Sequence, residues 1–170
     1  MTPENAGGTS PSAISTAWAS PPGDAAHGPN GPRNVVYNCD VRGVRAGVWL
    51  GGMNCGWIFV GNRFDVGNGP AFDIRGNSRE HHIARNVMSL RKTKTAVLLK
   101  TADCGGTHVV DNAIHAAGGA VAAGKAAPAV EKGNRILPPP AKGAKPPPRP
   151  KLKVPSIFDW QRKHRPLTGK

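Results

Sequence analysis

Asparagine recurs through the middle of the chain at a nearly constant interval, and this period limits the available folds more than any other feature. The intervals are 24, 24, 26 and 22 residues between Asn38, Asn62, Asn86, Asn112 and Asn134. Apolar residues stand three positions before the first four of these, at Val35, Phe59, Ile83 and Val109. A sequence period of about 20–50 residues indicates a solenoid, in which each repeat packs on the next.

A second pattern lies about ten residues further along each repeat. It reads GVWL at 47–50, AFDI at 71–74, AVLL at 96–99 and AVAA at 120–123. Because successive side chains of a strand point to opposite faces, the second and fourth residues of each segment, such as Val48 and Leu50, are predicted to point inward. The third residues are then predicted to point outward: Trp49, Asp73, Leu98 and Ala122.

Two patterns with one shared period predict short strands in coils that stack about 4.8 Å apart. The sequence therefore predicts an all-β fold, a short right-handed parallel β-helix of about four to five coils with extended N- and C-terminal arms. The recurring Asn is expected at a corner in the left-handed backbone conformation, which it tolerates well. Its amide is expected to hydrogen-bond from coil to coil as a ladder. The alternative, an antiparallel sandwich, lacks a residue-for-residue repeat of this length.

Four units resemble the parallel β-helix repeats of the pectate-lyase-like superfamily. They are NVVYNCDVRGVRAGVWLGG, WIFVGNRFDVGNGPAFDIRGN, HHIARNVMSLRKTKTAVLLKT and THVVDNAIHAAGGAVAAG. The resemblance covers about residues 33–137 and implies the fold. It implies less about function, because the superfamily includes polysaccharide lyases and hydrolases as well as phage tailspike and other virion proteins.

Composition divides the chain into three parts. Residues 1–32 are rich in Gly, Pro and Ala and are predicted to form a flexible arm. Its segment 13–20, with Trp18, could cap the first coil, as could a partner subunit. Residues 33–137 hold most of the apolar residues and form the predicted β-helix. Residues 138–170 contain nine Lys or Arg residues against Asp159 alone, within a formal net charge of +13 for the chain. Such a charge favours an acidic partner.

The C-terminal arm is predicted to be extended and semi-rigid, because PPP occurs in it twice. It ends in an apolar cluster flanked by basic residues, which is typical of a segment that fastens to a neighbouring subunit. Its PxxP motifs could instead bind small adaptor domains, and plain disorder is a third interpretation. The residues predicted to bind a partner are Lys151, Lys153, Ile157, Phe158, Trp160, Arg162, Lys163 and Arg165.

Candidate catalytic and metal-binding groups do not combine into a site. The resembled enzymes use acidic residues on neighbouring coils, but the positions equivalent to Asp73 hold Trp49, Leu98 and Ala122. A glycosidase needs two carboxyl groups about 5–9.5 Å apart across a cleft, and no such pair is evident among Asp40, Asp65, Asp73, Asp103 and Asp111. His82 and His108 are expected to stack, with His81 as the nearest third ligand; a structural role is favoured, and no metal or cofactor is predicted.

Two further groups of residues carry weaker predictions. The three cysteines, Cys39, Cys55 and Cys104, lack CxxC spacing and are expected to be free thiols. A basic surface that could bind phosphates or acidic sugars, or simply keep the stack soluble, is predicted at Arg75, Arg85, Arg91, Lys92 and Lys94.

The sequence thus favours a non-enzymatic structural or adhesive component of a larger assembly. The specific expectation is a phage capsid-decorating or tail-associated protein that binds coat protein through its arms, as a homo-oligomer such as a trimer. The alternatives are a glycan-binding or glycan-cleaving β-helix and a nucleic-acid-associated basic protein. The first residues, MTPENAGGTS, lack a basic stretch followed by an apolar run, so no cleaved signal peptide is expected. No apolar run of about 18 residues occurs in the sequence, so no membrane-spanning helix is expected either. A virion location is expected for a phage protein, and a cytoplasmic one otherwise, with no membrane partner.

Overall fold

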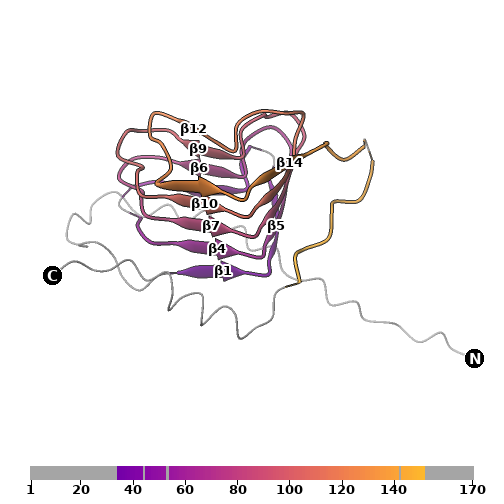
Figure 1. Cartoon of the computed structure of the whole chain (residues 1–170), viewed down its shortest axis with the longest axis horizontal. Coiled ribbons are helices and arrows are strands. Elements are labelled where there is room, and N and C mark those ends of the chain that lie inside the picture. Colours follow the sequence, from indigo (N-terminus) through magenta and orange to yellow (C-terminus); the bar gives the residue numbers. More distant parts are fainter. Residues whose placement is uncertain (1–33, 44, 53, 142, 152–170) are drawn as a thin grey trace, which may run out of the picture.

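The computed structural model describes residues 34–43, 45–52, 54–141 and 143–151, and its strands lie between Val35 and Leu137. Three short strands make one coil, and each strand pairs in parallel with its equivalent in the next coil. The coils rise in the right-handed sense usual for parallel crossovers (Figure 1). About four coils are complete, so the predicted parallel β-helix is confirmed. The part of the chain that is described contains no helix able to cross a membrane.

The strands form three parallel sheets, which we name A, B and C in the order in which the chain visits them. Sheet A contains β1 (Val35–Tyr37), β4 (Ile58–Val60), β7 (His82–Ala84), β10 (His108–Val110) and β13 (Val130–Lys132). Sheet B contains β2 (Asp40–Gly43), β5 (Arg63–Val66), β8 (Val87–Leu90), β11 (Ala113–His115) and β14 (Arg135–Leu137). Sheet C contains β3 (Val48–Leu50), β6 (Phe72–Ile74), β9 (Val97–Leu99) and β12 (Ala122–Gly124).

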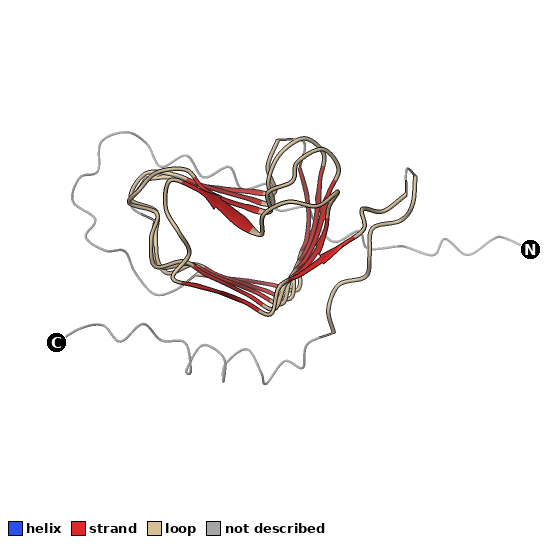
Figure 2. Cartoon of the chain, turned by 45° about the horizontal axis from the view of Figure 1, so that its top comes forward, coloured by secondary structure: helices blue, strands red, loops and turns tan. Residues whose placement is uncertain are grey.

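The hydrophobic core fills the space enclosed by the three sheets (Figure 2). Phe59, Phe64 and Phe72 point into it from sheets A, B and C of one coil. The ring centroids of Phe59 and Phe64 lie 4.9 and 4.8 Å from that of Phe72, in edge-to-face contacts. Such pairs add about 0.5–1.5 kcal/mol each to the free energy of burial. Three phenylalanine rings therefore fill the core of the second coil.

A second apolar cluster lies on the outer face of sheet A. Ile58, Val60, Ala84 and Val110 are buried there, and Val35, Tyr37 and Val130 pack against them. Successive side chains of the sheet A strands therefore point alternately into the core and into this second, outer apolar cluster. In sheet B, by contrast, β5 alternates buried Phe64 and Val66 with half-buried Arg63 and Asp65.

The predicted register is correct in the middle coils and wrong by one residue at each end. At the first coil, Val36 pairs with Phe59, so the inward residue of β1 is Val36 and not Val35. At the last coil, Ala122 and not Val121 pairs with Val97. Ala122 thus packs against the core instead of pointing outward.

Candidate functional site

The corner between sheets A and B has two adjacent positions with different roles. The residue that follows each sheet A strand has a positive φ between 52° and 67°, and these residues are Asn38, Gly61, Arg85, Asp111 and Gly133. The next residue is Cys39 in the first coil and Asn in the four later coils. The left-handed conformation therefore belongs to the residue before the ladder position. The prediction that the repeated Asn itself has this conformation is correct for Asn38 and wrong for the other four.

The repeated Asn side chains form a hydrogen-bonded ladder inside the corner. The Asn62 backbone N–H and Nδ2 donate to Oδ1 of Asn86 at 2.9 and 3.1 Å, and Asn86 donates to Asn112 at the same two distances. Asn112 donates in turn to Asn134. The predicted ladder is confirmed for these four residues. Asn38 does not belong to it, because the Cys39 N–H is the group that donates to Asn62 Oδ1, at 2.9 Å.

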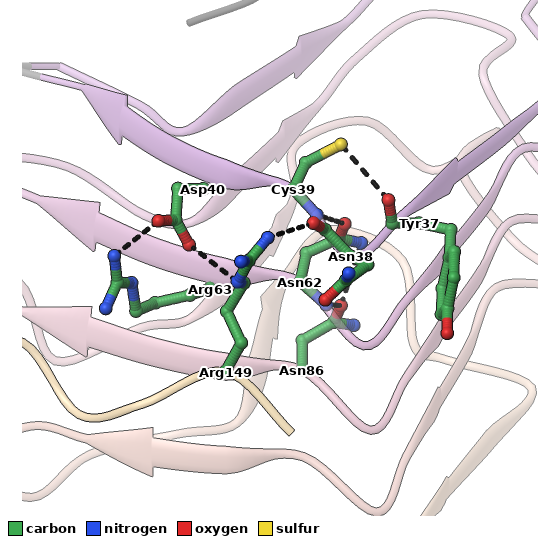
Figure 3. A network of polar contacts seen from close by, with 8 residues as sticks. All are labelled: Tyr37, Asn38, Cys39, Asp40, Asn62, Arg63, Asn86 and Arg149. Carbon is green, nitrogen blue, oxygen red and sulfur yellow. Dashed lines mark hydrogen bonds and ion pairs between the residues drawn. The ribbon is translucent and has the colours of Figure 1, made fainter. Parts of the chain in front are cut away.

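The C-terminal arm returns from the last coil to the first. Residues 138–151 follow β14 without forming a strand in their described part, and pass down the side of the stack (Figure 1). Arg149 then reaches the A–B corner, where its Nε lies 3.3 Å from Asp40 Oδ1 and its Nη1 donates to the backbone oxygen of Asn38 (Figure 3). The other oxygen of Asp40 pairs with Arg63 from the second coil. Arg149 therefore fastens the arm to the opposite end of the solenoid.

The structure places only part of the predicted arm and its anchor. Lys151 is exposed just beyond Arg149. Lys153, Arg162, Lys163 and Arg165, the apolar residues Ile157, Phe158 and Trp160, and the proposed capping segment 13–20 lie outside the described residues. The partner-binding prediction for these residues stays a prediction.

Four carboxylates of the described stack have an arginine partner. Asp40 and Asp65 pair with arginines of the next coil, Arg63 and Arg91. Asp73 is paired within its own coil by Arg75, and this hydrogen bond is the main cause that raises the pKa of the Arg75 guanidinium. Glu80 lies 3.8 Å from Arg79, where both side chains are about half exposed. Partly exposed pairs contribute about 0.2–1 kcal/mol each to stability. The main effect of the Asp40–Arg63 and Asp65–Arg91 pairs is therefore to fix the register between coils.

The predicted anion-binding residues are divided among three corners of the coil. Arg85 lies at the A–B corner, where its φ is positive. Arg75 follows sheet C and is engaged by Asp73. Arg91, Lys92 and Lys94 lie together in the turn between sheets B and C, all exposed. The structure therefore brings three of the five predicted residues together.

His81, His82 and His108 make packing and hydrogen-bond contacts within the stack. His82 and His108 are register partners, with ring centroids 5.3 Å apart, so the expected stacking is confirmed. His81 is fully buried, accepts a hydrogen bond from the Trp57 N–H at 3.3 Å, and has Nε2 2.9 Å from Ser78 Oγ. No group of three potential metal ligands is found among the described residues. A buried Ser–His pair has the spacing of a nucleophile and its base, but neither side chain is accessible to a substrate.

Burial lowers the pKa of His81 to about 4, from an ordinary value of 6.5. The folded protein therefore keeps this imidazole neutral while the unfolded chain protonates it, and stability present above pH 6.5 is lost as the pH falls towards 4. We expect the free energy of unfolding to drop by about 2–3 kcal/mol between pH 7.5 and 4.5 from this group. Urea titrations at both pH values measure it. The variant His81→Gln should show a smaller drop than the wild type, and an equal drop would contradict the assignment.

The cysteines are free, as predicted. Cys104 is buried, with its Sγ 3.0 Å from the Thr101 hydroxyl, whereas Cys39 and Cys55 are half-buried. Cys39 occupies the first position of the Asn ladder. Sequence reasoning assigned that position to Asn38. The signal for Cys39 is Val41, which lies two residues after Cys39 as Phe64 lies two residues after Asn62, and the two are register partners.

Comparison with protein-family models, with curated proteins and with solved structures gave no match.

Proposed function

We propose that the protein is a non-catalytic structural or adhesive module of a larger assembly. The observation that carries this proposal is that the paired polar side chains of the stack join one coil to the next. The Asn ladder and the pairs Asp40–Arg63 and Asp65–Arg91 all join one coil to the next. Arg149 joins the arm that leaves the last coil to the first. Groups of this kind produce a rigid body of defined length, which is what a building block requires.

The specific form of the proposal is a phage capsid-decorating or tail-associated protein that binds coat protein and forms a homo-oligomer. Two arguments support it: the resemblance of the repeats to virion β-helices, and the strongly basic C-terminal arm. Arg149 holds the arm at the first coil, so the described part of the arm ends at that end of the stack, at Lys151. A basic arm at one end of a rigid rod is suited to an acidic protein surface.

The two alternatives have one supporting feature each. A glycan-binding β-helix is favoured by an exposed aromatic row, and among the described residues Trp49 is the only large aromatic side chain that is mostly exposed, at 53 %. The equivalent positions are Asp73 in the second coil and Leu98 in the third, so the aromatic row does not continue. A nucleic-acid-associated protein is favoured by the basic turn at Arg91, Lys92 and Lys94, and would lose affinity steeply with added salt.

Size-exclusion chromatography with light scattering tests the proposal on the full chain and on a version that ends at Leu137. We expect the full chain to have the mass of a homo-oligomer and the shortened chain to be a monomer. A full chain carrying Ile157→Ser, Phe158→Ser and Trp160→Ser separates the apolar anchor from the rest of the arm. Identical monomers for all three, with no particle co-purifying, would contradict the proposal.

A further inference from the structure

The turns that connect sheet B to sheet C concentrate positive charge on one side of the stack. The described residues of these turns are 45–47, 67–71, 91–96 and 116–121. They contain no Asp or Glu, and their exposed cationic side chains are Arg45, Arg91, Lys92 and Lys94. The turns lie directly on one another. A Cβ on Gly69 would lie 1.5 Å from the Arg45 carbonyl oxygen, and one on Gly119 would lie 2.2 Å from that of Lys94. Close stacking therefore places the cations of the first coil, Arg45, and of the third coil, Arg91, Lys92 and Lys94, on the same side of the stack. Figure 2 shows the turns between sheets B and C following the same path.

A groove of about 320 Å³ adjoins this surface, lined by Arg42, Gly43, Asp65, Gly67 and Arg91. Arg42 and Asp65 are register partners in adjacent coils. The Asp65 carboxylate is occupied by Arg91, whose Nη2 lies 3.1 and 3.2 Å from its two oxygens and whose Nε lies 3.3 Å from Oδ1. Arg42 is exposed and has no ion pair among the described residues. The groove thus contains one neutralised guanidinium and one free one.

We propose that this groove and the adjoining turns bind a carboxylate-rich segment of a partner protein. One carboxylate of the segment pairs with Arg42 in the groove, and further carboxylates contact Arg45, Lys92 and Lys94. The guanidinium is a planar fork that matches a carboxylate with two parallel hydrogen bonds. The groove already holds one such pair, in which Arg91 Nε donates to Asp65 Oδ1 and Arg91 Nη2 donates to Asp65 Oδ2. This inference rests on the proposed function, in which the partner is a protein subunit.

Fluorescence anisotropy with a labelled decapeptide of alternating Glu and Asp tests the proposal on the full chain. The variant Arg42→Gln, Lys92→Gln, Lys94→Gln should bind the peptide at least ten-fold more weakly than the wild type at 50 mM NaCl. The matched control Lys100→Gln, Lys125→Gln, Lys132→Gln removes the same charge from exposed residues elsewhere on the stack. Its affinity should change less than two-fold. Thermal melts by circular dichroism verify that both variants fold.

A gain of affinity provides the second readout. Asp65→Asn removes the carboxylate that occupies Arg91, so it should strengthen peptide binding about three-fold, whereas Asp103→Asn at an exposed site should have no effect. Equal losses in the two triple variants would show a non-specific charge effect and overturn the proposal. Tenfold tighter binding of a dT oligonucleotide of the same charge would overturn the protein partner in favour of nucleic acid. Neither result alters the oligomer mass, which tests the proposed function separately.

Discussion

Asn86→Ala is expected to destabilise the protein by about 3–5 kcal/mol, because it interrupts the ladder at its centre. Asn86 Oδ1 accepts hydrogen bonds from the backbone N–H and the Nδ2 of Asn62, and its own Nδ2 donates to the Phe59 oxygen. Both Asn residues are at most 1 % exposed, so water cannot replace the lost partner. Each unpaired buried group costs about 1–3 kcal/mol. Urea denaturation followed by far-ultraviolet circular dichroism measures the loss.

Asn38→Gly is the matched control for this substitution. Asn38 is an exposed corner residue with φ 52°, and Gly adopts such a conformation without strain. The contact that Arg149 makes with this residue is to the backbone oxygen, which the substitution retains. The free energy of unfolding should therefore change by less than about 1 kcal/mol. A loss comparable to that of Asn86→Ala would show that Asn38 belongs to the ladder after all.

Leu99→Ala is expected to destabilise the protein by about 3 kcal/mol, while Leu98→Ala should cost less than about 1 kcal/mol. The two leucines are neighbours in β9 and undergo the same chemical change. Leu99 is fully buried and points into the core between the sheets, whereas Leu98 points outward and is half-buried. Removing a buried leucine leaves a cavity in addition to the lost transfer free energy. Chemical denaturation of the pair tests the alternation directly, and equal losses would contradict it.

The repeat predicted the fold because it fixes which residues lie above one another. The predicted register was wrong by one residue where two adjacent positions accept the same residue type. At the A–B corner, Asn suits both the left-handed position and the ladder position. Asn38 occupies the first of these and Asn62 the second, so a spacing of 24 concealed a true spacing of 23 between Cys39 and Asn62. In the last coil, Val121 was assigned the inward position because it is the largest side chain of AVAAG, but Ala122 is the register partner of Val97 and Val121 is buried one position earlier.

The candidate site could be predicted only in part, for a related reason. A repeat assigns a residue to a coil, but the corner on which its side chain lies depends on the strands that flank it. Arg75, Arg85 and Arg91 were therefore grouped although they belong to different corners. The return of the arm to Asp40 was not predictable. The composition of a Pro-rich segment such as PPPRPKLK indicates how stiff it is, but not which part of the stack it will contact.

Disulfide cross-linking across the coils tests the stacked register most directly. With Cys39, Cys55 and Cys104 replaced by Ser, Ser and Ala, the pair Asp73→Cys and Leu98→Cys occupies register partners. Their Cα atoms are about 4.8 Å apart, within the range of about 4.4–6.8 Å that a disulfide spans. The pair Trp49→Cys and Leu98→Cys lies two coils apart, at about 10 Å. The account predicts rapid oxidation of the first pair and none of the second; the reverse, or equal oxidation of both, would contradict it.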